Sequence, residues 1–357
     1  MDIFYRNHIF KYILYKVFKI RIKASNQLPN SFYLFYRIVF PFEKYHTTNF
    51  HSIINEAFNK VSKSGELEFL IKYNKGVTIE PNSGYALNDK SEILLFSLPY
   101  GDTLGTPFPH HIYYKKKKII RLNRAVSIYY NWFNYWHFHN DILGQLYILD
   151  LNQFSKDIPI LMPEKALNLE YVKYFLSTSF AKKWNWYFQK DNEYYKIDEI
   201  YFCKSIPNIS LHFIFSKNIF QEKITYNSSS NRKIFLTRNS NRGRTISNIK
   251  ELEILLKIYH FEIIDADSLS FKDQIILFSE AKTLCGIHGA GLTNMLFRHG
   301  CDSTIIEIFP ENFIPVHYYW LSQELGFNYI PAFGSILEND SFIFPSVELE
   351  RILKHLD

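Results

Sequence analysis

Apolar and polar residues alternate most regularly in the last third of the chain. Short apolar runs with the length of buried strands lie at 233–237, 261–266, 283–287, 303–309 and 327–330. Between them, apolar residues recur at helical spacing, which predicts helices at 248–260, at 271–281, from about 290, and at 316–325. Strands and helices that alternate in this way predict a parallel sheet with helices on both faces, so we expect an α/β domain.

The pattern before residue 217 is less regular. Apolar runs at 92–97, 148–151 and 158–162 favour strands, whereas 131–149 favours a helix with aromatic flanks. A polar stretch that ends in Asn-Ser-Ser-Ser-Asn is typical of a linker. The expected parts are a second α/β domain at 1–217, a linker at 218–232, the first-described α/β domain at 233–340, and at 341–357 a terminal helix that could pack back on the N-terminal domain.

Length and composition agree with two folded domains. A chain of 357 residues exceeds what one hydrophobic core usually organises, and 47% hydrophobic with 21% charged residues is the balance of a folded protein. Aromatic residues reach 18%, but many Lys, Asn and Ile residues accompany them, as expected from AT-rich codons, so this excess alone indicates no binding site. Three scattered cysteines form neither a disulfide framework nor a metal site, which favours a reducing compartment.

The N-terminal segment is basic and partly apolar. No apolar run approaches the roughly 18 residues of a spanning helix, and four basic residues interrupt 1–20, so we expect no secretory signal. A helix there would carry one apolar and one basic face, suited either to an anionic membrane surface or to ordinary solvent exposure. The net charge of +6 favours anionic partners only weakly, and Lys115–Lys118 is expected to be a solvated loop because no nucleic-acid-binding motif accompanies it.

The stretch 284–297 carries the most informative pattern. A buried strand runs into Gly286, His288, Gly289, Ala290 and Gly291, and a helix follows. Glycines let a ligand approach the backbone, and a helix N-terminus offers N–H groups to an anion, so this turn predicts a phosphate site. The third glycine of the dinucleotide fingerprint is missing, as are a Walker A lysine and the Gly-x-Ser-x-Gly of esterases. The alternative is a tight structural turn with His288 satisfied by hydrogen bonds.

Basic residues follow the first strand of the same domain. Arg238 lies directly after the strand, and Arg242 and Arg244 follow. Ligands of α/β sheets bind at the carboxyl ends of strands, where arginines can pair with a diphosphate. The alternative is a solvated basic loop.

Two pairs of residues and one single residue carry further candidate chemistry. His137 and Asp141 are four residues apart, so a helix would place them on one face, where either could act as a general base. The alternatives are a metal site together with His139, and side chains that only pack in the core. The pair Asp265 and Asp267 matches a metal-binding pattern. Acidic residues are also common before a capped helix, and we favour this second interpretation. Glu307 lies in an apolar strand and therefore needs a partner, either a ligand hydroxyl or a neighbouring side chain.

These motifs together resemble glycosyltransferase family 61. The family's pattern appears as Arg238 followed by RTISNIKEL, FEII, LSFKDQIILFSEA, GIHGAGLTNMLF and IIEIFP, and more loosely upstream as NYWHFHND at 134–141. Ile287 and Phe138 depart from the family pattern, and neither departure removes a functional group. The region before residue 125 does not align.

The resemblance implies a GT-B fold, in which two Rossmann-like domains face a cleft, here with a helical N-terminal extension. It implies that the enzyme transfers a sugar of the xylose or N-acetylglucosamine type, with inversion, to a glycan or lipid-linked acceptor. The implied donor is a nucleotide-diphosphate sugar, with a UDP-sugar as the favoured one. It further implies a bacterial role in capsular or lipopolysaccharide synthesis, in the cytoplasm at the inner membrane face, with residues 1–23 as a possible peripheral membrane contact. No metal or cofactor and no nucleic acid is expected.

The implied roles fall on the residues singled out above. The turn Gly289-Ala290-Gly291, His288 and Arg238 would bind the diphosphate with help from Arg244, while Asn294, Gln274 and Glu307 would contact the nucleoside. Asp141 or His137 would deprotonate the acceptor hydroxyl. The aromatic residues of 132–138 could stack against a sugar ring. The alternatives are a non-catalytic nucleotide-sugar or polysaccharide-binding protein on the same fold, and a hydrolase that uses His288.

Overall fold

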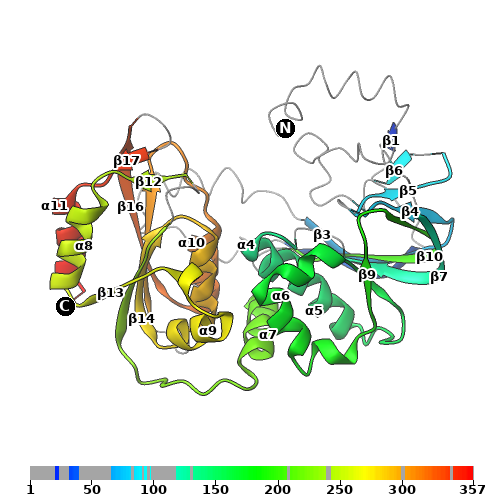
Figure 1. The fold of residues 1–357 in the computed structure, drawn as a ribbon, viewed down its shortest axis with the longest axis horizontal. Coiled ribbons are helices and arrows are strands. Elements are labelled where there is room, and N and C mark those ends of the chain that lie inside the picture. The colour runs from blue at the N-terminus through cyan, green and yellow to red at the C-terminus, as the bar shows by residue number, and fades with distance from the viewer. Residues whose placement is uncertain are drawn as a thin grey trace. The chain divides into compact units, whose positions relative to one another are not determined.

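The computed structural model describes residues 21–23, 32–39, 66–81, 84–90, 92–94, 97, 118–128, 132–206, 210–238, 243–298, 302–337 and 341–356. These residues form two compact units (Figure 1): unit 1 runs up to Ile206 and unit 2 starts at Ser210. The basic helix expected at 1–20 lies outside the described residues, and Arg21–Lys23 forms strand β1. Among the described residues, no helix combines the length and apolar character needed to cross a membrane.

Unit 2 contains a seven-stranded sheet with the order β12-β17-β16-β15-β14-β11-β13. All neighbouring strands are parallel except β16 and β17. The strands are β11 (Arg232–Leu236), β12 (Thr245–Ile246), β13 (Phe261–Ile264), β14 (Ala281–Ile287), β15 (Thr304–Pro310), β16 (Asn328–Ile336) and β17 (Ser341–Ile343). The five strands predicted from the apolar runs are therefore confirmed, and β16 is longer than predicted.

Helices cover both faces of this sheet (Figure 1). On one face, α8 (Ile249–Ile258) and α11 (Ser346–Lys354) pack together over a core that includes Leu252, Phe235 and Ile306. On the other face lie α7 (Ser210–Gln221), α9 (Phe271–Ser279), the 3-10 helix η9 (Ala290–Phe297) and α10 (His317–Leu325), which contact one another. The predicted α/β architecture of this unit is confirmed.

The strand order fixes where a ligand would bind. After β11 the chain forms the short strand β12 at the far edge of the sheet, then α8 and β13 beside β11, and it then crosses back to form β14 on the other side of β11. Helix α8, which lies between β11 and β13 in the chain, covers one face of the sheet, and η9, which follows β14, covers the other, so the connections after β11 and β14 run over opposite faces. Such a switch point leaves a crevice between diverging loops, and this crevice is where open α/β sheets bind ligands.

Unit 1 is built on a ten-stranded mixed sheet. Its parallel part has the order β10-β7-β8-β9, and β3 and β4 join β10 in antiparallel pairing. The remaining strands are β2 (Tyr33–Val39), β3 (Glu66–Tyr73), β4 (Val77–Ile79), β5 (Ala86–Leu87), β6 (Glu92–Leu94), β7 (Lys118–Ser127), β8 (Ile160–Pro163), β9 (Trp186–Gln189) and β10 (Glu193–Lys204). The helices are α4 (Tyr135–His137), the π-helix η4 (Phe138–Ile142), α5 (Leu143–Leu151), α6 (Glu170–Ser177) and the 3-10 helices η5 (Glu164–Asn168) and η6 (Ala181–Lys183). The chain is thus a mixed α/β protein with two sheets, and the arrangement of two domains across a cleft stays a prediction.

One secondary-structure prediction was wrong. Residues 148–151, expected as a strand, belong to α5, which buries residues on nearly all sides, including Leu143, Leu146 and Leu149. A short apolar run in such a buried helix lacks a polar face, so periodicity does not separate it from a buried strand. The helix expected from about residue 290 is confirmed and is the 3-10 helix η9.

The expected domain boundaries also shift. Residues 218–221 of the expected linker belong to α7, because Phe220 packs on Phe271 and Phe297 and so joins this helix to unit 2. The expected C-terminal helix begins only at Ser346, after β17. It packs on α8 within unit 2 rather than on the N-terminal domain, because its apolar face completes the core over this sheet face.

Candidate functional site

The side chain of Arg238, which lies after β11, packs against the glycine turn that follows β14. A Cβ atom on Gly289 would lie 2.1 Å from Nη1 of Arg238, and a Cβ on Gly291 would lie 2.7 Å from Cδ2 of Leu236. The Arg238 guanidinium therefore lies directly against the backbone of Gly289, which only a residue without a side chain permits. The two clusters predicted separately from the sequence meet at one place, and Ala290 opens the helix η9 beside them.

A pocket forms where these segments meet. Arg238 is held there because its Nε donates a hydrogen bond to the carbonyl oxygen of Gly243 at 2.9 Å. The pocket is lined by Leu236, Thr237, Arg238, Asp265, Ala266, Asp267, Ile287, Gly289 and Gly291. These residues follow or end β11, β13 and β14, so the pocket occupies the switch point of the sheet.

His288 is fixed by a buried carboxylate. Its Nδ1 lies 2.5 Å from Oε1 of Glu307, and the hydroxyl of Tyr329 donates to Oε2 of Glu307 at 2.5 Å. Burial, and then the Glu307 carboxylate, raise the pKa of Tyr329 well above its usual value, so Tyr329 keeps its proton. Glu307 engages Nδ1 of His288, so Nε2 is the ring nitrogen left for a ligand.

This pairing corrects the role expected for Glu307. Its side chain is fully buried, and its two oxygens bond His288 and Tyr329. Glu307 therefore supports His288 rather than contacting a nucleoside, and the need for a partner that the sequence predicted is met by neighbouring side chains.

Arg244 lies in a strained and half-buried position. Its φ is 54° and that of Gly243 is 68°, so two successive residues adopt the left-handed conformation, which is unfavourable for arginine. The guanidinium carbon lies 5.1 Å from the centre of the Phe313 ring, and this same ring lies 5.6 Å from that of His288. Burial lowers the pKa of Arg244, whereas Tyr318 and Glu307 act in the opposite direction. Its buried Nη1 has no hydrogen-bond partner among the described residues, which suits an anionic ligand.

Gln274 and Asn294 make hydrogen bonds beside the pocket. The amide nitrogen of Gln274 donates to the carbonyl oxygens of Ala266 at 2.8 Å and Leu269 at 3.3 Å, and Nδ2 of Asn294 donates to Oε1 of Gln274 at 3.3 Å. Asn294 is buried. These amides hold the turn at 265–269 in place, and their contact with a nucleoside stays a prediction.

His137 and Asp141 form the predicted pair on one helix face in unit 1. Nδ1 of His137 lies 2.8 Å from Oδ2 of Asp141, while Nδ2 of Asn140 donates to Oδ1 of Asp141 at 2.8 Å. Asp141 lies in the π-helix η4, a helix type that often marks functional sites. The His137 side chain is 26% exposed and that of Asp141 is 10% exposed, so the imidazole is the more accessible member.

The alternative of a metal site with His139 does not fit the geometry. His139 is fully buried with its ring 4.8 Å from that of Tyr135, and no group of three metal-ligating side chains gathers among the described residues. The rings of Trp132, Trp136 and Phe138 are buried and belong to the core, whereas Phe133 is 53% exposed, so stacking against a sugar stays a prediction for Phe133.

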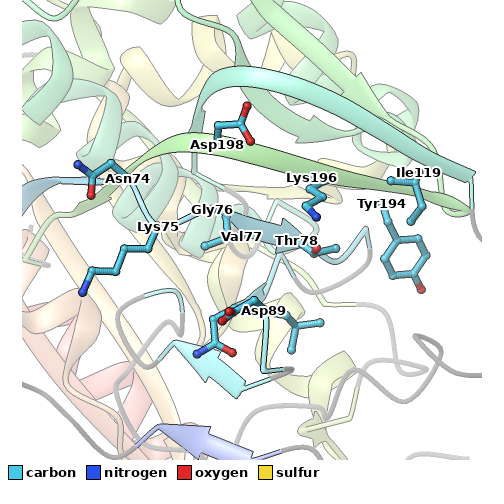
Figure 2. Close-up of a pocket in the computed structure, with 12 residues that line it drawn as sticks. Asn74, Lys75, Gly76, Val77, Thr78, Asp89, Ile119, Tyr194, Lys196 and Asp198 are labelled. Atoms are coloured by element: carbon cyan, nitrogen blue, oxygen red, sulfur yellow. The ribbon is translucent and has the colours of Figure 1, made fainter.

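A second cavity, of about 710 Å³, lies in unit 1 (Figure 2). Thr78 of β4, Ile119 of β7, and Tyr194 and Lys196 of β10 surround it, and it contains none of the predicted site residues. The charged side chains in its lining are two lysines and two aspartates, Lys75, Lys196, Asp89 and Asp198. This cavity lacks the arginine and the Gly289–Gly291 turn that the pocket at Arg238 combines.

Sequence reasoning missed several residues of the unit 2 site. Asp265 and Asp267, interpreted as ordinary helix-start residues, line the pocket with Arg238. A signal existed for Asp265, since it directly follows β13 and Arg238 lies two residues after the end of β11. Tyr329 and Phe313 gave no such signal, because each is one of many aromatic residues and only side-chain contacts distinguish them.

Comparison with known protein families gives one match. Residues 135–306 match the family model described as Glycosyltransferase 61. No curated protein matches the chain significantly. The matched stretch holds the His137–Asp141 pair, Arg238 and the glycine turn, and it confirms the resemblance inferred from the sequence blocks. This match, over slightly less than half of the chain, supports membership of glycosyltransferase family 61.

Proposed function

We propose that this glycosyltransferase moves a sugar, with inversion, from a nucleotide-diphosphate donor to a hydroxyl of a glycan acceptor. The observation that carries the proposal is the contact of the Arg238 guanidinium with the backbone of Gly289, in a pocket at the switch point of the unit 2 sheet. A guanidinium beside a glycine turn that opens a helix matches the negative charge of a diphosphate.

The sugar-donor side uses positive charge to stabilise the leaving group. Arg238 and the backbone N–H groups of the glycine turn bind the diphosphate, Arg244 supplies a second cation, and Nε2 of His288 faces the same anion. Charge develops on the diphosphate as the glycosidic bond breaks, and preorganised cations stabilise it without reorganisation. Such a site works without a metal ion, and a UDP-sugar is the proposed donor.

The acceptor side uses His137 as general base with Asp141 as its positioning residue. Asp141 already accepts a hydrogen bond from Asn140 and is nearly buried, whereas His137 is more exposed. The carboxylate orients the imidazole and stabilises the imidazolium that forms when His137 takes the proton of the acceptor hydroxyl. The hydroxyl oxygen then attacks the anomeric carbon from the face opposite the diphosphate, which inverts the configuration.

The sugar-donor site is tested by a thermal-shift screen of nucleotide sugars. We expect one UDP-sugar to raise the melting temperature by several degrees at saturation, because a ligand that binds only the folded state stabilises it. Arg238→Ala should weaken this binding about tenfold or more, since charge-assisted hydrogen bonds are lost. Lys196→Ala is the matched control, because it removes one cation from the lining of the unit 1 cavity. Equal loss in both variants would contradict the assignment.

The base is tested by single-turnover kinetics with Asp141→Asn. Loss of the carboxylate leaves the imidazole poorly oriented, so we expect the rate to fall by about a hundredfold or more with unchanged affinity for the sugar donor. Asp150→Asn is the control, because Asp150 is a solvent-exposed carboxylate on α5 that pairs with Lys156. Near-normal turnover in both Asp141→Asn and His137→Ala would show that the base lies elsewhere.

The proposed substrate is a sugar of the xylose or N-acetylglucosamine type, and the proposed role is bacterial cell-surface polysaccharide synthesis, in the cytoplasm at the membrane surface. These proposals rest on the family, since the described residues do not select one sugar. If the protein binds a nucleotide sugar through Arg238 but neither transfers nor hydrolyses it with any glycan, a non-catalytic binding protein replaces the transferase.

A further inference from the structure

The turn after β13 places carboxylates in the pocket of Arg238. Asp265 directly follows β13, the strand beside β11, and lines the pocket together with Arg238 and Gly289. Asp265 is exposed. The pocket therefore offers a cation and a carboxylate to the same ligand.

The position of Asp265 is fixed by hydrogen bonds around it. The backbone N–H and the hydroxyl of Thr237 both donate to the carbonyl oxygen of Ile264, at 2.8 and 3.1 Å, and tie the end of β13 to the residue before Arg238. Oδ1 of Asp265 accepts a hydrogen bond from the backbone N–H of Asp267 at 3.0 Å, and Nε2 of Gln274 donates one to the carbonyl oxygen of Ala266. Oδ2 of Asp265 has no hydrogen-bond partner among the described residues. Such bracing is typical of a group that is preorganised for a ligand.

The chemistry of this carboxylate limits what it can bind. It repels phosphate groups, so it must meet a neutral or cationic part of the ligand that Arg238 holds. A carboxylate accepts hydrogen bonds from two hydroxyls at once. In nucleotide-binding α/β domains, an acidic residue farther along the chain than the phosphate-binding turn accepts from ribose hydroxyls. A divalent cation is the competing occupant, but the described residues bring no third acidic, His or Cys ligand to this place.

We propose that Asp265 binds the ribose hydroxyls of the sugar donor, so that the enzyme uses ribonucleoside diphosphate sugars and rejects deoxyribonucleoside diphosphate sugars such as those of deoxythymidine. The proposal rests on the proposed function, because it assumes that the diphosphate lies at Arg238. It adds a specificity-determining residue for this donor.

The test compares the affinity of UDP with those of its 2′-deoxy and 3′-deoxy analogues, by calorimetry on the full chain with EDTA present. Wild type should bind at least one deoxy analogue about tenfold more weakly than UDP, because a hydrogen bond to a charged group is lost. Asp265→Asn keeps an oxygen for the N–H of Asp267 but loses the charge, so this discrimination should fall to about threefold or less. Asp302→Asn, just before β15 at the amino ends of the strands, changes charge equally and should leave the discrimination unchanged.

The possible outcomes distinguish ribose binding by Asp265 from cation binding, and both from a failure of the proposed function. If wild type binds UDP and both deoxy analogues equally, or if Asp265→Asn weakens all three by the same factor, the ribose assignment is wrong. If discrimination appears only after Mg²⁺ or Mn²⁺ replaces EDTA, the carboxylate binds a cation and the assignment is also wrong. If no nucleoside diphosphate binds at all, with UDP, GDP and ADP each tried, the proposed function fails with it. Binding of UDP that depends on Arg238 but shows no discrimination overturns only this inference.

Discussion

Gly289 and Gly291 lie two residues apart in one turn but meet different neighbours. A Cβ on Gly289 would collide with the end of the flexible Arg238 side chain, whereas a Cβ on Gly291 would collide with the buried side chain of Leu236. The guanidinium can swing away, but the packed leucine cannot move without disturbing the core. The same chemical change therefore has two different consequences.

This contrast gives a prediction for Gly289→Ala and Gly291→Ala. Gly289→Ala should lose UDP binding by about tenfold with little change in the free energy of unfolding, because it displaces only Arg238. Gly291→Ala should lower the free energy of unfolding by about 1–3 kcal/mol, because it overpacks the core. Urea denaturation and UDP titration of both variants measure the two effects. A Gly289→Ala protein with intact UDP affinity would mean that Arg238 does not need its observed position.

The sequence predicts that Glu307 has a partner, but not which residue the partner is. A carboxylate in an apolar strand predicts a partner, because an unpaired buried charge is very costly. The identity of the partners does not follow from the sequence, since His288 is 19 residues away and Tyr329 is 22 residues away. Only the pairing of β14, β15 and β16 brings the three together.

At the scale of elements, α7 contributes a buried histidine to unit 2. Burial lowers the pKa of His212 from 6.5 to about 3, and its Nε2 has no hydrogen-bond partner among the described residues. The folded protein therefore keeps His212 neutral, while the unfolded chain takes up a proton below pH 6.5. The stability that this group contributes is complete above pH 6.5 and is lost progressively as the pH falls towards 3.

We predict that His212→Gln reduces the acid sensitivity of folding. Between pH 7.5 and pH 5, the free energy of unfolding of wild type should fall by about 2 kcal/mol more than that of His212→Gln. His355→Gln, which changes an exposed histidine just after α11, should behave like wild type. The compared quantity is the change with pH, so a loss of stability common to both pH values does not affect it. Equal falls in wild type and His212→Gln would contradict the prediction.

Whether an element could be predicted from the sequence depended on its length and on whether one of its faces is polar. In unit 2, the strands β11, β13, β14 and β15 are short apolar runs separated by helices, so the local pattern identified them closely. In unit 1, short antiparallel strands such as β4 and β5 carry only two or three residues, too few for a periodicity. Helix α5 is buried on nearly all sides and lacks the polar face that would reveal its period.

At the scale of the whole molecule, the described residues form two units with separate cores, and the candidate residues divide between them. Arg238, Arg244 and the glycine turn belong to unit 2, whereas His137 and Asp141 belong to unit 1. A transferase that uses both sets must bring the two units to one substrate. The GT-B arrangement implied by the resemblance meets this requirement.

Hydrogen exchange tests this arrangement. Saturating UDP-sugar should slow amide exchange at 232–238 and 286–298, where the diphosphate is proposed to bind. In a GT-B arrangement it should also slow exchange at 134–142, while β3 to β6 of unit 1 remain unchanged and serve as the internal control. Protection confined to unit 2 would contradict a shared cleft, and uniform protection of both units would indicate global stabilisation instead of a local site.

The sequence by itself determined the α/β class of unit 2, most of its strands and helices, and the family. It also predicted that Arg238 and the glycine turn share one edge of the sheet, because parallel strands carry their following loops to the same end. These features depend on local periodicity, on caps and on chain order, all of which are written along the chain.

The tertiary structure decided which polar groups bind each other and which remain for a ligand. It assigned Glu307 to His288 and Tyr329, used Gln274 and Asn294 to brace the turn at 265–269, and brought Asp265 into the pocket. Such contacts join residues far apart in sequence, and they depend on strand order and on side-chain packing across the sheet. No local pattern encodes them, because hydrogen-bond partners are selected by distance in space.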